Sequence, residues 1–135
     1  MQQSQQRKPK EANIPTIFLK GFYIEEETEQ LHFYEEIETP LLLVEHITSF
    51  KENVFWVKIK NLWVLIGKIP PLKIEPNDIV LFQEKGKWGL FRYLGEEKEK
   101  VILQDGKEQR KTKVDKDVLE KLNFFGKVLR VQEKI

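Results

Sequence analysis

The sequence lacks cysteine and has few of the other side chains used in covalent catalysis. Its 135 residues include no Cys, two Ser (Ser4 and Ser49) and two His (His32 and His46). The absence of Cys excludes disulfides, thiol nucleophiles and thiolate zinc sites. His46 and Ser49 share a short predicted turn, which does not aim an imidazole at a hydroxyl, and the histidines have no metal-binding spacing. We therefore expect no catalytic site, no metal and no other cofactor.

Long apolar runs and a glycine-rich phosphate loop are also missing. No apolar run reaches the roughly 18 residues of a membrane-spanning helix. The first residues, MQQSQQRKPK, contain no apolar core of an export signal, and the seven Gly are scattered. These absences favour a cytoplasmic protein that does not contact a membrane.

The residues that are present are typical of a globular domain. Apolar residues make up 40% of the chain, with nine Phe, three Trp and three Tyr, and the net charge is only +1. Residues 1–13 are rich in Gln and Lys without apolar periodicity, which predicts a flexible tail before a single β domain at 14–135. The many Lys and Glu, with one Met, also resemble thermophile usage.

Short runs of β-branched and aromatic residues predict a mainly β fold. We expect strands at 16–24, 30–34, 54–60, 62–66, 79–83, 88–94, 101–104 and 124–131, with hairpin turns at EEETE and at Lys85-Gly86-Lys87. Asn61 is a candidate bulge, and the apolar spacing over 114–122 predicts a short helix with Asp115 as N-cap. The pattern favours an all-β barrel or a bent-sheet fold, and of these we expect a bent β-barrel with this one short C-terminal helix.

The hairpin at 79–94 also carries a candidate nucleic-acid surface. Aromatic rings beside cations can stack on bases and neutralise phosphates, and the residues that would do so are Lys85, Lys87, Trp88 and Arg92. The alternative is that the aromatic residues belong to the core and the charges only flank the hairpin.

The same hairpin resembles a known family. Residues 77–94, NDIVLFQEKGKWGLFRYL, are similar to the GDIVVV…DGEYTVKRL segment of LexA-like self-cleaving repressors, whose peptidase domain also occurs in UmuD-like proteins. Asp78 and Gly86 match the family's Asp and its hairpin Gly. The ending resembles the family's short helix and GxVxxV strand, with Gly126, Val128 and Val131 in place. The resemblance extends over about 14–135 and implies a bent barrel of the LexA-like peptidase-domain type, usually a homodimer.

The family's catalytic residues have no counterpart in this chain. Depending on the register, the nucleophilic Ser is replaced by Ile69 or Trp63, and the Lys base by Phe91 or Arg92. Neither register supplies a hydroxyl, and Arg does not deprotonate usefully. We therefore expect that the protein is not an enzyme.

The C-terminal strand is the predicted association surface. If it lies at a sheet edge, its unpaired backbone favours pairing with another chain, and its candidate interface residues are Phe125, Lys127, Leu129 and Val131. Alternatively, the strand is internal to one monomer. We expect a non-catalytic LexA-like domain acting as a protein-association or regulatory module, as a homodimer or with a related regulator; the alternative is a small β-barrel nucleic-acid-binding protein.

Overall fold

The computed structural model describes residues 14–69, 71–107, 109–117 and 126–134, and most of them lie in strands. The elements are β1 (Thr16–Ile24), β2 (Leu31–Pro40), the 3-10 turn η2 (Leu41–Leu43), the helical turn α2 (Phe50–Asn53), β3 (Val54–Ile59), β4 (Leu62–Lys68), β5 (Ile79–Glu84), β6 (Lys87–Glu97), β7 (Lys100–Asp105), β8 (Lys111–Asp115) and β9 (Gly126–Gln132). The prediction of a mainly β fold is confirmed. The predicted flexible tail at 1–13 falls outside the described residues.

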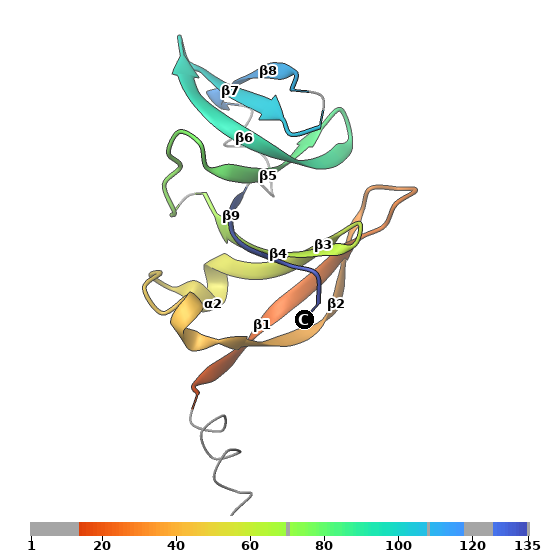
Figure 1. Ribbon diagram of the computed structural model, residues 1–135, viewed down its shortest axis with the longest axis vertical. Helices are drawn as coiled ribbons and strands as arrows, with labels where there is room; N and C mark the ends of the chain where they lie inside the picture. Colours follow the sequence, from red (N-terminus) through yellow and green to blue (C-terminus); the bar gives the residue numbers. More distant parts are fainter. Residues whose placement is uncertain (1–13, 70, 108, 118–125, 135) are drawn as a thin grey trace, which may run out of the picture.

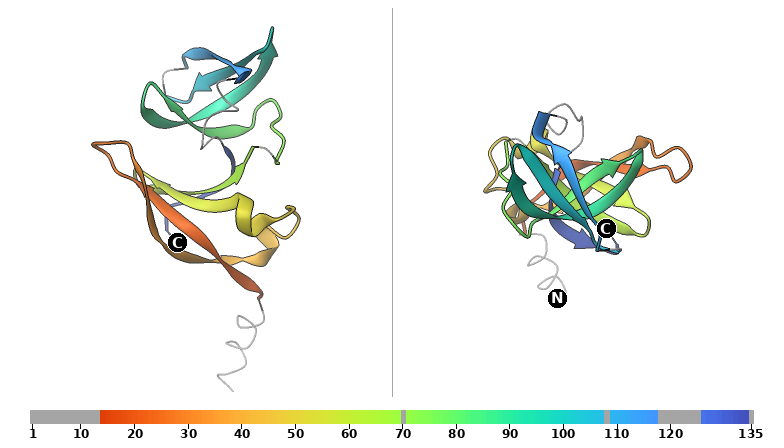
Figure 2. Two further views of the ribbon diagram at one scale, coloured as in Figure 1. Left: turned by 180° about the vertical axis from the view of Figure 1, so that it is seen from behind. Right: turned by 90° about the horizontal axis from the view of Figure 1, so that it is seen from above.

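The strands form one open sheet rather than the predicted barrel. Its order is β2-β1-β3-β4-β9-β5-β6-β7-β8, so β2 and β8 remain edges. The β1–β3 pair is parallel and the other pairs are antiparallel. Figures 1 and 2 show a lower half, β1–β4, and an upper half, β5–β8, with β9 running between them. The prediction of a bent β-barrel is therefore wrong in this respect, because the sheet does not close into a barrel.

The sheet changes direction at β9. This strand pairs with β4 from Gly126 to Gln132 but with β5 only at Gly126 and Lys127. A Cβ atom at Gly126 would overlap the Cγ2 methyl of Ile66 and lie 3.2 Å from the carbonyl oxygen of Gly67. Glycine therefore permits the close approach of the strands at this junction, and the short β5 pairing leaves the upper half free to turn away.

Three apolar clusters hold this arrangement together. The lower core consists of Leu19, Ile37, Val44, Ile47, Val54, Trp56, Trp63 and Leu65. The upper core consists of Val80, Phe82, Phe91, Tyr93, Val101 and Leu103. The central core consists of Phe55, Val57, Ile59, Val64, Ile66 and Leu81, with half-buried Trp88 and Leu90 packed against it. Because the central core takes residues from both halves, burial of its apolar surface joins them.

Two local predictions were wrong in instructive ways. Asn61 is not a bulge but part of the tight β3–β4 turn, beside Lys60 with φ 57°. Val114, predicted to begin a helix, belongs to β8, where it pairs with Val101 and packs against the upper core. The predicted N-cap, Asp115, ends β8, and Lys116 and Asp117 directly after it are helical, so this part of the prediction is confirmed. The remainder of the predicted helix, beyond residue 117, lies outside the described residues. The two predicted hairpins, β1–β2 and β5–β6, are confirmed.

Candidate functional site

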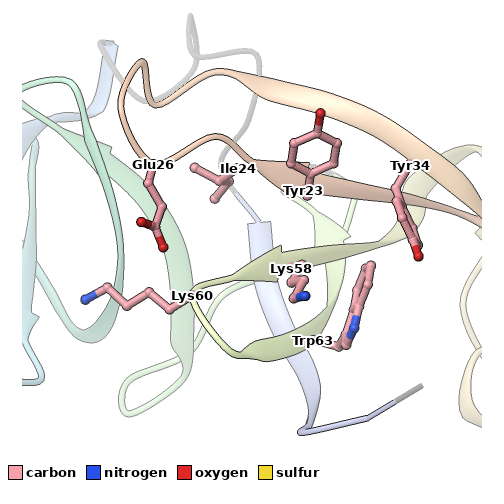
Figure 3. A pocket seen from close by; sticks show the side chains of 7 residues that line it. All are labelled: Tyr23, Ile24, Glu26, Tyr34, Lys58, Lys60 and Trp63. Atoms are coloured by element: carbon pink, nitrogen blue, oxygen red, sulfur yellow. The ribbon is translucent and has the colours of Figure 1, made fainter.

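Three aromatic rings from three strands meet at one side of the lower half. Tyr23 of β1 and Tyr34 of β2 have ring centroids 6.4 Å apart, and Tyr34 lies 5.7 Å from Trp63 of β4. They line a cavity of about 510 Å³, shown in Figure 3. We call it the aromatic pocket; its residues are Tyr23, Ile24, Glu26, Tyr34, Lys58, Lys60 and Trp63. Trp63 is only 8% exposed, whereas Tyr34 is 54% exposed, so the pocket has one buried side and one side open to solvent.

A bulge in β2 places Tyr34 in this pocket. Gly21 pairs with Glu35, but the next residue, Phe22, pairs with Phe33, which leaves Tyr34 as the extra residue on β2. A bulge re-aims a side chain that regular alternation would send elsewhere. Tyr34 therefore shares a face with Tyr23, while Phe33 packs edge-to-face on Phe22 on the opposite face.

Cations border the aromatic rings. The Lys58 Nζ lies 6.0 Å from the centroid of the Trp63 ring, within reach of a cation–π contact. Lys60 projects from the β3–β4 turn. Figure 3 shows Lys60 and Glu26 at one end of the pocket and Tyr34 and Trp63 at the other. The pocket thus combines aromatic faces with two ammonium groups and one carboxylate.

Two further cavities continue from the aromatic pocket around the β3–β4 turn. The nearer has a volume of about 560 Å³ and is lined by Ile24, Glu26, Glu29, Ile59, Lys60, Asn61, Lys87 and Trp88. The farther has about 320 Å³ and is lined by Ile59, Lys60, Leu62, Trp88, Gly89, Leu90, Asp105, Gly106 and Lys107. We call these two cavities together the lysine groove. Lys60 lines all three cavities, so the aromatic pocket and the lysine groove form a continuous surface.

Lys60 and Lys107 both line the farther cavity of the lysine groove, together with Asp105. The hydrogen bond and charge of the Lys107 amine lower the pKa of Lys60, while the carboxylates of Asp105 and Glu26 act in the opposite direction. The lysines therefore repel one another across the groove, and a bound anion would relieve that repulsion.

The structure separates the predicted nucleic-acid residues. Lys87 and Trp88 line the lysine groove, while Lys85 lies in the β5–β6 turn and Arg92 is exposed farther along β6. The Trp88 Nε1 donates to the carbonyl oxygen of Glu29 at 2.7 Å, and its backbone N–H donates to the Glu29 Oε1 at 2.8 Å. Through these two hydrogen bonds Trp88 connects the β1–β2 loop to β6, and its ring packs on the central core. Tyr23 and Tyr34 of the aromatic pocket, which sequence reasoning missed, are 37% and 54% exposed and offer the accessible rings of this surface.

The predicted interface residues occupy different environments. Phe125 lies outside the described residues. Lys127 pairs with strands on both sides, and its Nζ lies 3.2 Å from Asp78 Oδ2. Leu129 packs against the lower core, whereas Val131 is 49% exposed. The predicted edge position is wrong for the start of β9; from Val128 onward the described part of the strand pairs with β4 alone.

The positions matched to the family's catalytic Ser and Lys carry apolar side chains or lie in different halves of the molecule. Ile69 packs against the upper core that contains Phe91. Trp63 belongs to the lower core, and Arg92 is exposed on β6 in the other half. In the described ranges, no group of three or more His, Asp or Glu residues is placed to hold a metal ion.

Comparisons with known proteins do not assign a family. Neither protein-family models nor curated proteins match the chain. Within the part of the chain that the structure describes, no helix is long and apolar enough to cross a membrane. The site must therefore be interpreted from its own chemistry.

Proposed function

We propose that this chain is a non-catalytic binding protein that takes single-stranded nucleic acid on the aromatic pocket and the lysine groove. The observation that carries the proposal is the contact of Tyr23, Tyr34 and Trp63 beside Lys58 and Lys60. Aromatic faces stack on unpaired bases, and lysines along the same path attract the phosphates between them.

A single strand fits this surface better than a duplex. Stacking requires a base whose face is free, and a duplex buries those faces within its own helix. Each stacked base contributes about 1–3 kcal/mol. The lysines of the surface are Lys58, Lys60, Lys87 and Lys107. With about four phosphates neutralised, log K should fall with log salt at a slope of about −3. The carboxylates of Glu26 and Asp105 make the slope shallower.

The test is fluorescence anisotropy of a labelled single-stranded oligonucleotide at several salt concentrations. Tyr34→Ala removes a ring that is 54% exposed, so we expect little change in stability and a roughly 5- to 100-fold loss of affinity. Phe18→Ala is the matched control, because Phe18 is 59% exposed on the opposite face of β1 and should bind like the wild type. Equal affinities of the two variants for the oligonucleotide, or an affinity that does not change with salt concentration, would contradict the proposal.

Association with a second protein chain is the other candidate function, and one observation favours it. Among the described residues, Val128–Gln132 of β9 pair with β4 on one side only. Unpaired strand edges are templates for pairing, and two copies related by a two-fold axis would bury identical segments. The resemblance to LexA-like domains supports a homodimer, or a complex with a related regulator, through this segment.

A further inference from the structure

We infer that Lys60 and Lys107 form an oxyanion site in the farther cavity of the lysine groove, and that it takes a phosphate group. The identity of its natural occupant, a phosphate of the bound strand, rests on the function proposed above. The capacity to bind phosphate does not, because it depends only on these two side chains and their surroundings.

Two turns from different halves of the molecule bring the lysines together. Lys60 lies in the β3–β4 turn, where its positive φ of 57° fixes the direction of the chain. Lys107 lies in the β7–β8 turn, where its backbone N–H donates to the Asp105 Oδ1 at 2.7 Å. The Gln109 N–H closes the same turn on the Asp105 carbonyl oxygen at 3.0 Å. Both lysine side chains line the farther cavity, so turns far apart in sequence converge on one space.

The electrostatics of this space favour an anion. The nearby amine of Lys107 lowers the pKa of Lys60, even though Asp105 and Glu26 act to raise it. Two ammonium groups that line the same cavity repel one another, and an oxyanion bound to both would replace that repulsion with two charge-assisted hydrogen bonds.

Phosphate suits the lining better than a simple halide. Each ammonium offers three donors without a fixed plane, which matches the several oxygens of a tetrahedral anion. The lining also includes the apolar side chains of Ile59, Leu62 and Leu90. The volume of about 320 Å³ lies within the usual range of small-ligand sites. Lys87, in the adjoining cavity, adds further positive charge along the same groove.

The test uses inorganic phosphate and NMR of the lysine amines, with chloride at equal ionic strength as the reference. Phosphate should shift the Nζ signals of Lys60 and Lys107 and raise the pKa of Lys60 in a pH titration. Lys60→Ala and Lys107→Ala should each weaken phosphate binding by about tenfold or more. Lys111→Ala is the control, because Lys111 is exposed on β8 and does not line the cavity. An unchanged wild-type spectrum, or shifts that persist in both cavity variants, would overturn the inference.

An oligonucleotide titration separates this inference from the proposed function. If phosphate binds but the oligonucleotide does not, the oxyanion site stands and the nucleic-acid function fails. If the oligonucleotide binds wild type and Lys107→Ala equally while phosphate has no effect, the function stands and the oxyanion site is wrong. Loss of both ligands in Lys107→Ala, but of the oligonucleotide alone in Tyr34→Ala, supports both.

Discussion

The indole N–H of Trp56 depends on one threonine in the lower core. Trp56 is 1% exposed and Thr39 is fully buried. The Trp56 Nε1 donates to Thr39 Oγ1 at 2.8 Å, and that hydroxyl donates to the Ile37 carbonyl oxygen at 3.0 Å. Thr39→Val keeps the shape but removes both bonds, so we expect the free energy of unfolding to fall by about 1–3 kcal/mol. Urea denaturation measures the change.

The control for this prediction is Thr48→Val. Thr48 is exposed in the turn before α2, where a substitution is expected to change stability by less than about 0.5 kcal/mol. If Thr39→Val proved as mild as Thr48→Val, the buried hydrogen bond would not be needed for stability.

At the scale of single residues, the sequence predicted types of side chain better than their positions. Of the aromatic and basic residues in the 85–92 region, the structure places Lys87 and Trp88 in the lysine groove, and their binding of nucleic acid stays a prediction. The same pattern could not show that the Trp88 indole is bonded to Glu29, because that contact spans 59 residues. Nor could it find Tyr34 in the aromatic pocket, because the bulge there is a property of the β1–β2 register.

At the scale of elements, a carboxylate network links strands that are not neighbours in the sheet. Glu84 of β5 accepts from the Arg110 guanidinium at 2.6 and 3.2 Å and from the Thr112 hydroxyl of β8 at 2.8 Å. In the sheet order, β6 and β7 lie between β5 and β8. The upper half therefore curls until its two outer strands are joined by side chains, although the sheet as a whole stays open.

This network predicts a specific dependence of stability on pH. Hydrogen bonds from Arg110, with a further one from Thr112, hold the pKa of Glu84 below its ordinary value of 4.5. A lowered folded-state pKa contributes stability above about pH 4.5, and that contribution is lost as the pH falls through the folded-state pKa. Glu84→Gln should therefore be less stable than wild type at neutral pH, and the difference should shrink in acid.

Thermal melts of both proteins across the acid range measure this difference. Glu97→Gln is a suitable control, because Glu97 is 56% exposed and its closest ion-pair distance, to Lys113, is 3.9 Å. A gap between wild type and Glu84→Gln that stays constant with pH would contradict the assigned role of the Glu84 carboxylate.

The strands differ in how well their sequence pattern predicted them. The continuous apolar runs of β3 and β4 were recognised because both faces of those strands are buried. In contrast, β8 is a short edge strand whose two half-buried residues, Thr112 and Val114, give little apolar signal. The apolar residues that follow Val114 fitted a helical period, so the predicted helix began at Val114, two residues before the first helical residue, Lys116.

At the scale of the whole molecule, closure of the sheet was the property least accessible from sequence. Strand composition is the same in an open and a closed sheet, and the difference here lies in the junction at β9. The same junction decides which part of the C-terminal strand is available for association. Lys127 is paired with strands on both sides, and Leu129 packs against the lower core. A substitution at either position would therefore disturb the fold as well as any interface.

Self-association through β9 is best tested at Val131, which is 49% exposed. In a two-fold pairing of residues 128–132, each copy meets the same segment of the other, so one substitution alters both sides. Sedimentation at micromolar concentration should find the wild type dimeric. Val131→Glu should be folded and largely monomeric, because it places two like charges within the short paired segment.

Leu42→Glu is the matched control for the association test, since Leu42 is 62% exposed and lies in η2, outside the β9 segment. It adds the same charge without touching the strand, so it should sediment as the wild type does. Circular dichroism of each variant establishes that a change in mass reflects association rather than unfolding. A monomeric wild type would remove the homodimer from consideration, and a folded Val131→Glu that stays dimeric would place the interface on a surface other than β9.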